Sequence, residues 1–223
     1  MAELYHLGVP TAAVPRFVLL VDPQLGGAPV VDVVGGRPLA SRREYVSHLG
    51  VWAGQDLLVT TVGVGAPPLA IAVEELSRAG AEAVVLLSAA RLVGVSTRWL
   101  VPYGATRGDG TSAQYAPLQY PAVPDPGVRA ALAAASGTDA SYGVVETVDV
   151  LHPEASGNPT SGREMRCAAL FVVSAVRGVR AGALLADGRG PAAMQADAST
   201  VHDMAVAACR ALTDLDGTTQ GRS

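Results

Sequence analysis

The chain has 223 residues, of which 49% are hydrophobic and 16% charged, and this composition fits one large α/β domain with a substantial core. A net charge of −4 without a basic cluster argues against a nucleic-acid partner. Cys167 and Cys209 are too few for a disulfide scaffold, and the apolar runs are shorter than the roughly 20 residues of a membrane span. We therefore expect a soluble cytoplasmic protein with reduced thiols.

Runs of apolar and β-branched residues predict strands, and runs with apolar residues at helical spacing predict the helices between them. The predicted strands cover residues 17–21, 40–52, 57–62, 83–87, 97–107, 141–150 and 181–186. The predicted helices cover residues 69–79, 124–136, 163–176 and 199–212, and residues 30–34 fit either type. Residues 151–162 are a predicted loop. The domain then spans residues 1–212, and residues 213–223 form a polar tail that we expect to be disordered.

The stretch 57–87 has the order strand, glycine-containing turn, helix, strand. This order is typical of a βαβ unit, whose right-handed crossover places the two strands parallel. Ligands of such sheets bind at the carboxyl ends of strands, so the turn 61–66 and the segment 88–92 are the places to expect a site. The glycines of the turn allow close approach of a ligand, but an ordinary tight turn explains them equally well. The segment 88–92 offers no glycine and no anion-binding side chain except Arg91.

No other motif identifies a chemistry from the residues alone. No two of the four histidines have the spacing of a metal-ligand pair, which argues against a metal site. Residues 109–112 are either a polar site loop or a surface turn. Glu164 and Arg166 stand at the start of a predicted apolar helix, where a solvated first turn explains them. Residue patterns therefore predict an α/β protein, with or without a small-molecule site.

Several collinear stretches resemble the uridine phosphorylase branch of the nucleoside phosphorylase family. They are YHLG at 5–8, VDP at 21–23, LASRREY at 39–45, TVGVGAPPLAIAVEEL at 61–76, GDGTSAQYAPLQYPAV at 108–123, REMRCAALF at 163–171 and VRAGALLA at 179–186. The resemblance implies a single α/β domain around a twisted, partly barrel-like mixed sheet flanked by helices. It also implies hexamers built from dimers, active sites at the dimer interface, and cleavage of a ribose–base bond by phosphate.

The positions that hold phosphate and nucleoside in the resembled family carry other residues here. Val21 and Leu25 stand in place of a glycine and an arginine, and residues 86–91 lack the second arginine and the threonine of the phosphate loop. Arg166 stands in place of the glutamate that binds the ribose hydroxyls. The short loop 151–162 lacks the segment that recognises the base.

Electrostatics predict that phosphorolysis does not occur in this chain's own pocket. A phosphate dianion that leaves water needs charge-assisted donors, each worth about 1.5–3 kcal/mol. With two arginines and a hydroxyl missing, nothing adequate compensates the desolvation of the anion. Arg91 stands where the phosphate loop has a glycine, and we expect its side chain to fill the pocket rather than to bind phosphate.

Two residues that the resemblance marks as acting across the dimer interface are present. His6 matches a histidine that reaches a neighbour's site near the ribose 5′-hydroxyl, and Arg43 matches an arginine that reaches the neighbour's phosphate. The resemblance also identifies what remains of the nucleoside pocket, namely Thr61, Gly63, Glu164, Met165 and Arg166. The competing interpretation is retention by chance, with Arg43 a simple surface charge.

Our interpretation is a degenerate uridine phosphorylase-like subunit, a pseudoenzyme without catalytic residues in its own pocket. It donates His6 and Arg43 to an active homologous subunit in a hetero-oligomer, or pairs with itself as a homodimer or hexamer. It binds a nucleoside but no nucleic acid, membrane, metal or cofactor, and phosphate is a co-substrate only if the chain is active. The alternatives are a nucleoside phosphorylase or hydrolase with altered chemistry, for which Asp187 is a candidate proton donor, and a nucleoside-binding protein.

Overall fold

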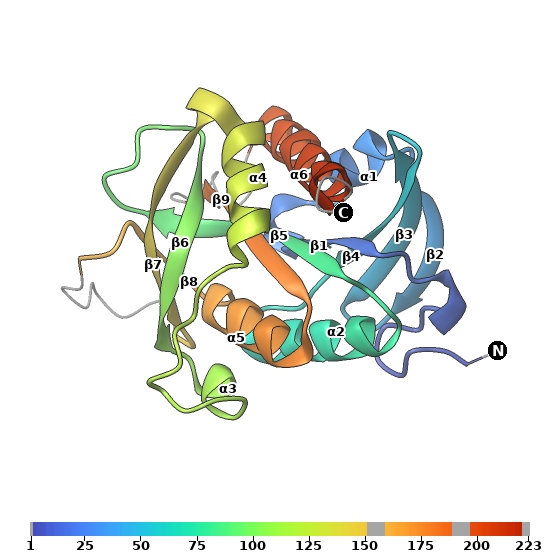
Figure 1. The fold of residues 1–223 in the computed structure, drawn as a ribbon, viewed down its shortest axis with the longest axis horizontal. Coiled ribbons are helices and arrows are strands. Elements are labelled where there is room, and N and C mark those ends of the chain that lie inside the picture. Colours follow the sequence, from blue (N-terminus) through green and yellow to red (C-terminus); the bar gives the residue numbers. More distant parts are fainter. Residues whose placement is uncertain (1, 151–158, 189–196, 220–223) are drawn as a thin grey trace.

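The computed structural model describes residues 2–150, 159–188 and 197–219 of the chain. These residues form a nine-stranded mixed sheet with helices around it (Figure 1). The strands are β1 (Phe17–Val21), β2 (Arg37–Arg42), β3 (Tyr45–Trp52), β4 (Gln55–Thr61), β5 (Ala83–Leu92), β6 (Trp99–Gly108), β7 (Ala140–Val148), β8 (Gly162–Glu164) and β9 (Arg180–Asp187). Their order across the sheet is β2-β3-β4-β1-β5-β8-β7-β6-β9. The predicted α/β class, with one mixed sheet flanked by helices, is confirmed.

Helices cover both faces of this sheet (Figure 1). The α-helices are α1 (Ala28–Val33), α2 (Ala66–Arg78), α3 (Gly110–Ala113), α4 (Pro126–Ser136), α5 (Cys167–Arg177) and α6 (Ala198–Thr219). α2 and α5 pack together on one face, whereas α4 and α1 each pack against α6 on the other. Within the described residues, no helix combines the length and the apolar character that a bilayer crossing requires.

β1 lies at the centre of the sheet, and both of its faces are buried. Alternate side chains of a strand point to opposite faces, so Val18 and Leu20 enter the core beneath α2 and α5. Leu19 and Val21 enter the second core, beneath α1, α4 and α6. Burial on both faces explains why this strand reads in the sequence as an unbroken apolar run.

β4, α2 and β5 form the predicted βαβ unit, and its strands are parallel, with β1 inserted between them. The register aligns Val21 of β1 with Thr61 of β4 on one side and with Leu87 of β5 on the other. The ends of β1 and β4 and the middle of β5 therefore meet at one edge of the sheet. This is the edge where α/β sheets of this kind bind ligands.

The other half of the sheet closes partly on itself, as expected. β5 pairs with β9 along most of its length and with β8 at its carboxyl end, and β7 and β6 complete the ring back to β9. This closure brings the start of α5, which follows β8, close to the carboxyl half of β5.

One predicted strand and one predicted helix were placed wrongly. Residues 40–52 are a hairpin, because Arg43 takes up a left-handed conformation (φ 55°) between β2 and β3. Residues 163–166 do not open α5, since Gly162–Glu164 is held as a strand between β5 and β7.

Two further segments complete the comparison with the predicted elements. The ambiguous run 30–34 falls mostly in α1, so it is helical. α6 continues to Thr219, into the stretch that we assigned to the tail. Residues 151–158 of the predicted loop lie outside the described residues.

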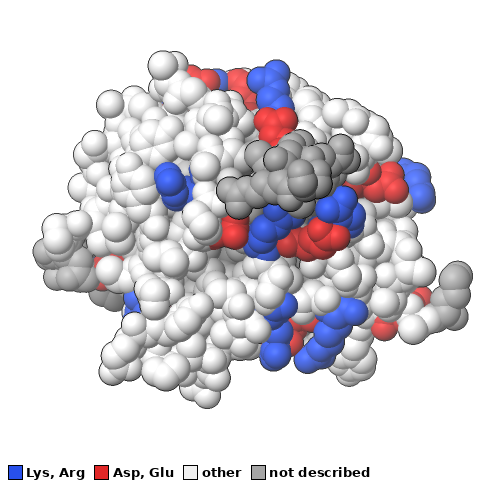
Figure 2. Space-filling model, viewed as in Figure 1, with Lys and Arg blue, Asp and Glu red and all other residues white. Residues whose placement is uncertain are grey.

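Charged side chains are unevenly spread over the face seen in Figure 2. They gather around α6 and toward the lower edge of the view, whereas the left part, over β6 and β7, is almost free of them. β6 and β7 expose Tyr103 and Tyr142, whose rings stack with their centroids 5.9 Å apart. The surface of the barrel-like half thus carries few charged side chains and exposes two stacked aromatic rings.

Candidate functional site

The candidate site lies at the sheet edge formed by β1, β4 and β5. Asp22 directly follows β1, Gly63 lies in the turn after β4, and Ser88 lies in β5 just beyond the residue that pairs with the end of β1. The crevice between these groups is not open. It holds the guanidinium group of Arg166, which comes from the segment between β8 and α5.

Arg166 forms a bidentate ion pair with Asp22. Nη1 lies 2.9 Å from Oδ2, and Nη2 lies 3.2 Å from Oδ1. Nη1 also donates to Oγ of Ser88 at 3.2 Å, while Nε and Nη2 donate to the carbonyl oxygen of Gly63 at 3.3 and 3.2 Å. These five hydrogen bonds match the five N–H donors of a guanidinium group. None of the donors remains for a ligand.

The ion pair is almost completely removed from water, with 3% of the Arg166 side chain and 0% of the Asp22 side chain exposed. Two further donors reach Oδ2 of Asp22, the hydroxyl of Ser88 at 3.0 Å and the backbone N–H of Ala89 at 3.2 Å. Buried charges persist only when they are paired and hydrogen-bonded, and here both conditions are met within one chain.

Glu164 directs the backbone that carries Arg166 into the crevice. Its Oε2 accepts from the backbone N–H groups of Arg166 (2.6 Å) and Cys167 (2.8 Å), and its Oε1 accepts from the hydroxyl of Thr147. Complete burial raises the pKa of Glu164, and these three hydrogen bonds oppose the shift. Glu164 therefore caps the first turn of α5 and has no free oxygen directed at a ligand.

The expectation that Arg91 fills the pocket is wrong. Arg91 is exposed, and Arg166 occupies the crevice instead. Ser88 and Arg91 lie three positions apart on β5, so their side chains point to opposite faces of the sheet. Val21 and Leu25, at positions where the resemblance implies phosphate-binding residues, are buried in the core that α6 covers.

The glycines of the turn 61–66 are explained by packing. A Cβ atom on Gly63 would lie 2.9 Å from Cβ of Pro68 and 3.0 Å from Cγ of Glu44, too close for any side chain. Gly65 has a φ of 88°, a conformation that favours glycine, at the residue before α2. The turn that resembles a ligand loop in the sequence is therefore required by the fold itself.

Thr61 also has structural partners. Its hydroxyl donates to the carbonyl oxygen of Glu44 at 3.0 Å and accepts from the N–H of Val46 at 2.9 Å. These bonds tie the end of β4 to the hairpin turn that carries Arg43. Met165 is half-buried near Gly65.

His6 and Arg43 both lie at the protein surface and both contact the ring of Tyr5. The rings of Tyr5 and His6 meet edge to face with centroids 4.8 Å apart, and the guanidinium carbon of Arg43 lies 5.9 Å from the Tyr5 centroid. Arg43 is exposed, and Tyr5 is 71% exposed. Nδ1 of His6 lies 2.7 Å from Oε1 of Glu75, a residue of α2. The structure thus brings together the two residues that the resemblance assigns to a neighbour's site.

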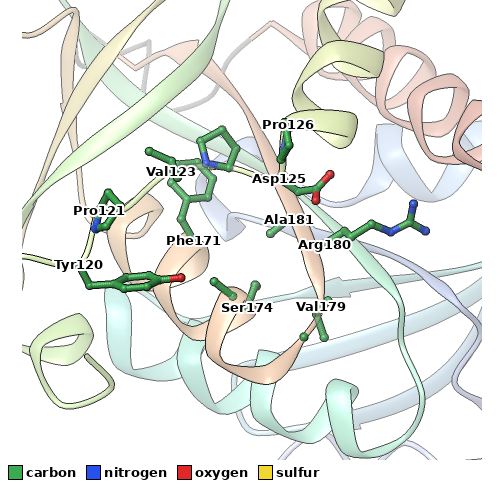
Figure 3. A pocket seen from close by; sticks show the side chains of 13 residues that line it. Tyr120, Pro121, Val123, Asp125, Pro126, Phe171, Ser174, Val179, Arg180 and Ala181 are labelled. Carbon is green, nitrogen blue, oxygen red and sulfur yellow. The ribbon is translucent and has the colours of Figure 1, made fainter. Parts of the chain in front are cut away.

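A cavity of about 360 Å³ lies near the carboxyl end of α5, and Figure 3 shows its lining. Tyr120 directs its hydroxyl into this cavity, and the guanidinium group of Arg180 points away from it. α5 has 11 residues and so spans about 16 Å. Since Arg166 precedes the first residue of α5, the cavity and the crevice are separate features of the molecule.

The sequence interpretation missed three residues that organise the site. Asp22 carries only a local signal, the cap of the short turn that follows it, where Oδ1 accepts from the N–H of Gln24. Ser88 and Glu75 carry no local signal, because their partners Arg166 and His6 lie 78 and 69 residues away in the sequence.

No family model matches the chain. It is nevertheless 32% identical over 209 residues to the uridine phosphorylase of Treponema pallidum, covering 81% of this chain and 80% of that protein. It is 31% identical over 211 residues to the uridine phosphorylase of Thermococcus kodakarensis, covering 82% and 76%. It is 30% identical over 159 residues to the guanosine phosphorylase of Halorubrum lacusprofundi, covering 66% of each chain.

Solved structures share the fold. The crystal structure of uridine phosphorylase from Vibrio fischeri superposes with a TM-score of 0.87 at 24% identity, over 96% of this chain and 98% of that one. The purine nucleoside phosphorylase from Toxoplasma gondii, in complex with immucillin-H, superposes with a TM-score of 0.84 at 21% identity and the same coverage.

Proposed function

Because the chain belongs to the nucleoside phosphorylase family, we propose that it is a non-catalytic, uridine phosphorylase-like subunit that completes the active site of a neighbouring phosphorylase. Its own crevice is closed by Arg166, and its exposed Arg43 and partly exposed His6 serve the neighbour. The names of its relatives point to a nucleoside and phosphate as the substrates of the neighbouring site.

The buried pair of Arg166 and Asp22 carries this proposal. A ligand can enter the crevice only if the guanidinium group leaves and gives up all five of its hydrogen bonds. Departure of Arg166 also leaves the Asp22 carboxylate buried and unpaired, which typically costs about 3–5 kcal/mol. Any ligand that enters the crevice, whether charged or neutral, has to offset this unfavourable free energy.

Phosphate faces a further obstacle in this crevice. An incoming dianion meets the carboxylate of Asp22, and charges of like sign at close range repel strongly in a water-poor site. Val21 and Leu25 line the neighbouring core with apolar side chains and offer no donor. Phosphorolysis in this chain's own site is therefore not expected.

The exposed residues support the second half of the proposal. Arg43 offers its guanidinium group on the surface, and no hydrogen bond within the described part of the chain engages it. Its cationic charge suits an anion such as phosphate, and the ring of His6, which also contacts Tyr5, suits a hydroxyl group. In our proposal, the positions that would bind a ligand in this chain's own crevice either carry apolar residues, as Val21 and Leu25 do, or form a structural contact, as Arg166 does. His6 and Arg43, at the surface, still offer polar groups to a neighbour.

We further propose the setting of this subunit. It pairs with a homologous phosphorylase subunit or with a second copy of itself, needs no metal or cofactor, and uses phosphate only through the neighbour. A cytoplasmic location is favoured by two buried free thiols, Cys167 and Cys209.

Two measurements on the purified chain test the proposal. The first is phosphate-dependent cleavage of uridine, thymidine, inosine and adenosine by the chain alone, with a parallel assay without phosphate for hydrolysis. The second is identification of chains that copurify with it at its natural expression level. We expect no cleavage by the chain alone and copurification of an intact phosphorylase homologue.

Turnover by the chain alone at an ordinary enzymatic rate, on the order of 1–10³ s⁻¹, overturns the non-catalytic assignment. Cleavage that does not need phosphate points instead to a nucleoside hydrolase. If the chain is monomeric at micromolar concentration and no homologue copurifies with it, there is no neighbouring subunit. That result refutes the proposed donation of His6 and Arg43.

A further inference from the structure

The N-terminal segment that carries His6 is clamped by two residues of its own chain. Glu75 of α2 accepts hydrogen bonds from the backbone N–H groups of His6 (2.8 Å to Oε1) and Leu7 (3.1 Å to Oε2). Arg42 donates to the carbonyl oxygen of Tyr5 at 3.1 Å. The surface around His6 is therefore ordered before any partner binds.

Glu75 also makes the hydrogen bond that orients the His6 ring, with 2.7 Å between Oε1 and Nδ1. An ionised carboxylate only accepts hydrogen bonds, so Nδ1 has to be the donor. In a neutral imidazole the other nitrogen, Nε2, then carries a lone pair. The His6 side chain is 30% exposed. Within the described residues its ring forms a hydrogen bond through Nδ1 only, and Nε2 has no partner.

We infer that Glu75 is a positioning residue that holds His6 in its Nδ1–H form, so that Nε2 accepts a hydrogen bond from the ligand of the neighbouring site. The role of the ligand in this inference rests on the proposed function. The ring state itself does not, because the isolated chain contains every group that determines it.

The inference defines the ligand chemistry that this surface takes. Nε2 favours a group that donates a hydrogen bond, such as a hydroxyl or an ammonium group, and disfavours a group that only accepts. Arg43, which also contacts the Tyr5 ring, favours an anion. Arg43 and His6 together therefore fit a ligand combination with one anionic group, which binds at Arg43, and one hydroxyl donor, which binds at His6. Because Glu75 keeps Nε2 of His6 a hydrogen-bond acceptor, the anionic group does not bind at His6.

The ring state can be read directly from the ¹⁵N chemical shifts of the His6 imidazole in the isolated chain. The spectrum is recorded at an alkaline pH at which the titration of the ring itself shows it to be neutral, and His6→Ala assigns the signals. We expect a proton on Nδ1 in the wild type and a shift toward a proton on Nε2 in Glu75→Gln. Glu74→Gln is the matched control, since Glu74 bonds Arg78 and Arg177 instead and should leave the ring unchanged.

The mixed complex with the active neighbour then tests the consequence. Loss of a neutral hydrogen bond changes binding by about two- to tenfold, so Glu75→Gln and His6→Ala should both raise the nucleoside KM by that order. A nucleoside whose 5′-hydroxyl is replaced by an amino group, assayed at a pH at which that group is a protonated ammonium and can only donate, distinguishes loss of positioning from general disorder. Its KM should rise more in Glu75→Gln than that of the parent nucleoside, because Nε2–H cannot accept.

A proton on Nε2 in the wild type overturns the inference, whether or not a neighbour exists. A KM that responds to His6→Ala but not to Glu75→Gln overturns it as well. If the ring state is as expected and neither variant affects the neighbour, the positioning by Glu75 stands and the proposed donation of His6 fails.

Discussion

Arg166 and Asp22 lie 144 residues apart in the sequence and form a buried bidentate ion pair, with Nη1 2.9 Å from Oδ2 and Nη2 3.2 Å from Oδ1. The pair closes the crevice at the carboxyl end of β1. An arginine of the chain thus occupies the edge of the sheet at which α/β sheets of this kind bind ligands. In our proposal, Arg166 has two consequences: it closes this chain's own site, which prevents activity there, and it forms a structural ion pair with Asp22.

Arg166→Met should destabilise the protein strongly, because it leaves the Asp22 carboxylate buried without its partner. We expect the free energy of unfolding, from denaturant titration, to fall by about 3–5 kcal/mol. The double variant Arg166→Met with Asp22→Asn should recover part of this loss, since no unpaired charge remains. Arg91→Met, an exposed arginine of β5, is the control and should change stability little. An equally small effect of Arg166→Met would mean that the pair does not hold the crevice closed.

Arg43→Ala should leave assembly intact and weaken phosphate use by the neighbouring subunit. One charged hydrogen bond to the anion is lost, and the barrier should rise by roughly 2–4 kcal/mol, mainly as a higher phosphate KM. Steady-state kinetics of mixed complexes measure this. Arg37→Ala removes another exposed arginine, at the start of β2, and serves as the control. Unchanged phosphate kinetics in Arg43→Ala complexes would reduce Arg43 to a surface charge.

The stability contribution of Glu164 should decline with rising pH. Its pKa is raised in the folded protein by complete burial, so the folded state holds the proton more tightly than the unfolded state. Stability from this group is fully present below the ordinary glutamate pKa of about 4.3 and is lost as the pH rises through the folded value. Denaturant titrations of the wild type and Glu164→Gln between pH 4 and pH 8 test it. The stability of the wild type relative to the variant should fall across this range, and a rise would mean that the capping hydrogen bonds outweigh burial.

Both thiols should be inert in the folded protein. Cys167 and Cys209 are fully buried, and burial raises the pKa of both, that of Cys209 to about 12. Since the thiolate is the reactive form, alkylation at pH 8 should be slow in the native protein and fast in denaturant. Rapid labelling of the native chain, followed by mass spectrometry, would show that the core around α5 or α6 opens readily.

Local sequence patterns determined the elements of this fold. The unbroken apolar run at 17–21 indicated a strand buried on both faces, and the strand, turn and helix pattern at 57–87 indicated the βαβ unit. These predictions succeed because side-chain periodicity and turn chemistry act over a few residues. The same locality explains the errors at 40–52 and 163–166, where a left-handed turn at Arg43 and a three-residue strand leave almost no periodic signal.

Only the tertiary structure decided what the candidate site contains. The sequence marked Arg166 as a departure from the resembled family but placed Arg91 in the pocket. The register of β1, β4 and β5, and the cap that Glu164 supplies, bring Arg166 to Asp22 instead. In the same way, Glu75 meets His6 only because the fold brings α2 against the N-terminal segment. Such contacts depend on strand register and side-chain direction, which arise from the packing of the whole domain and leave no trace in short stretches of sequence.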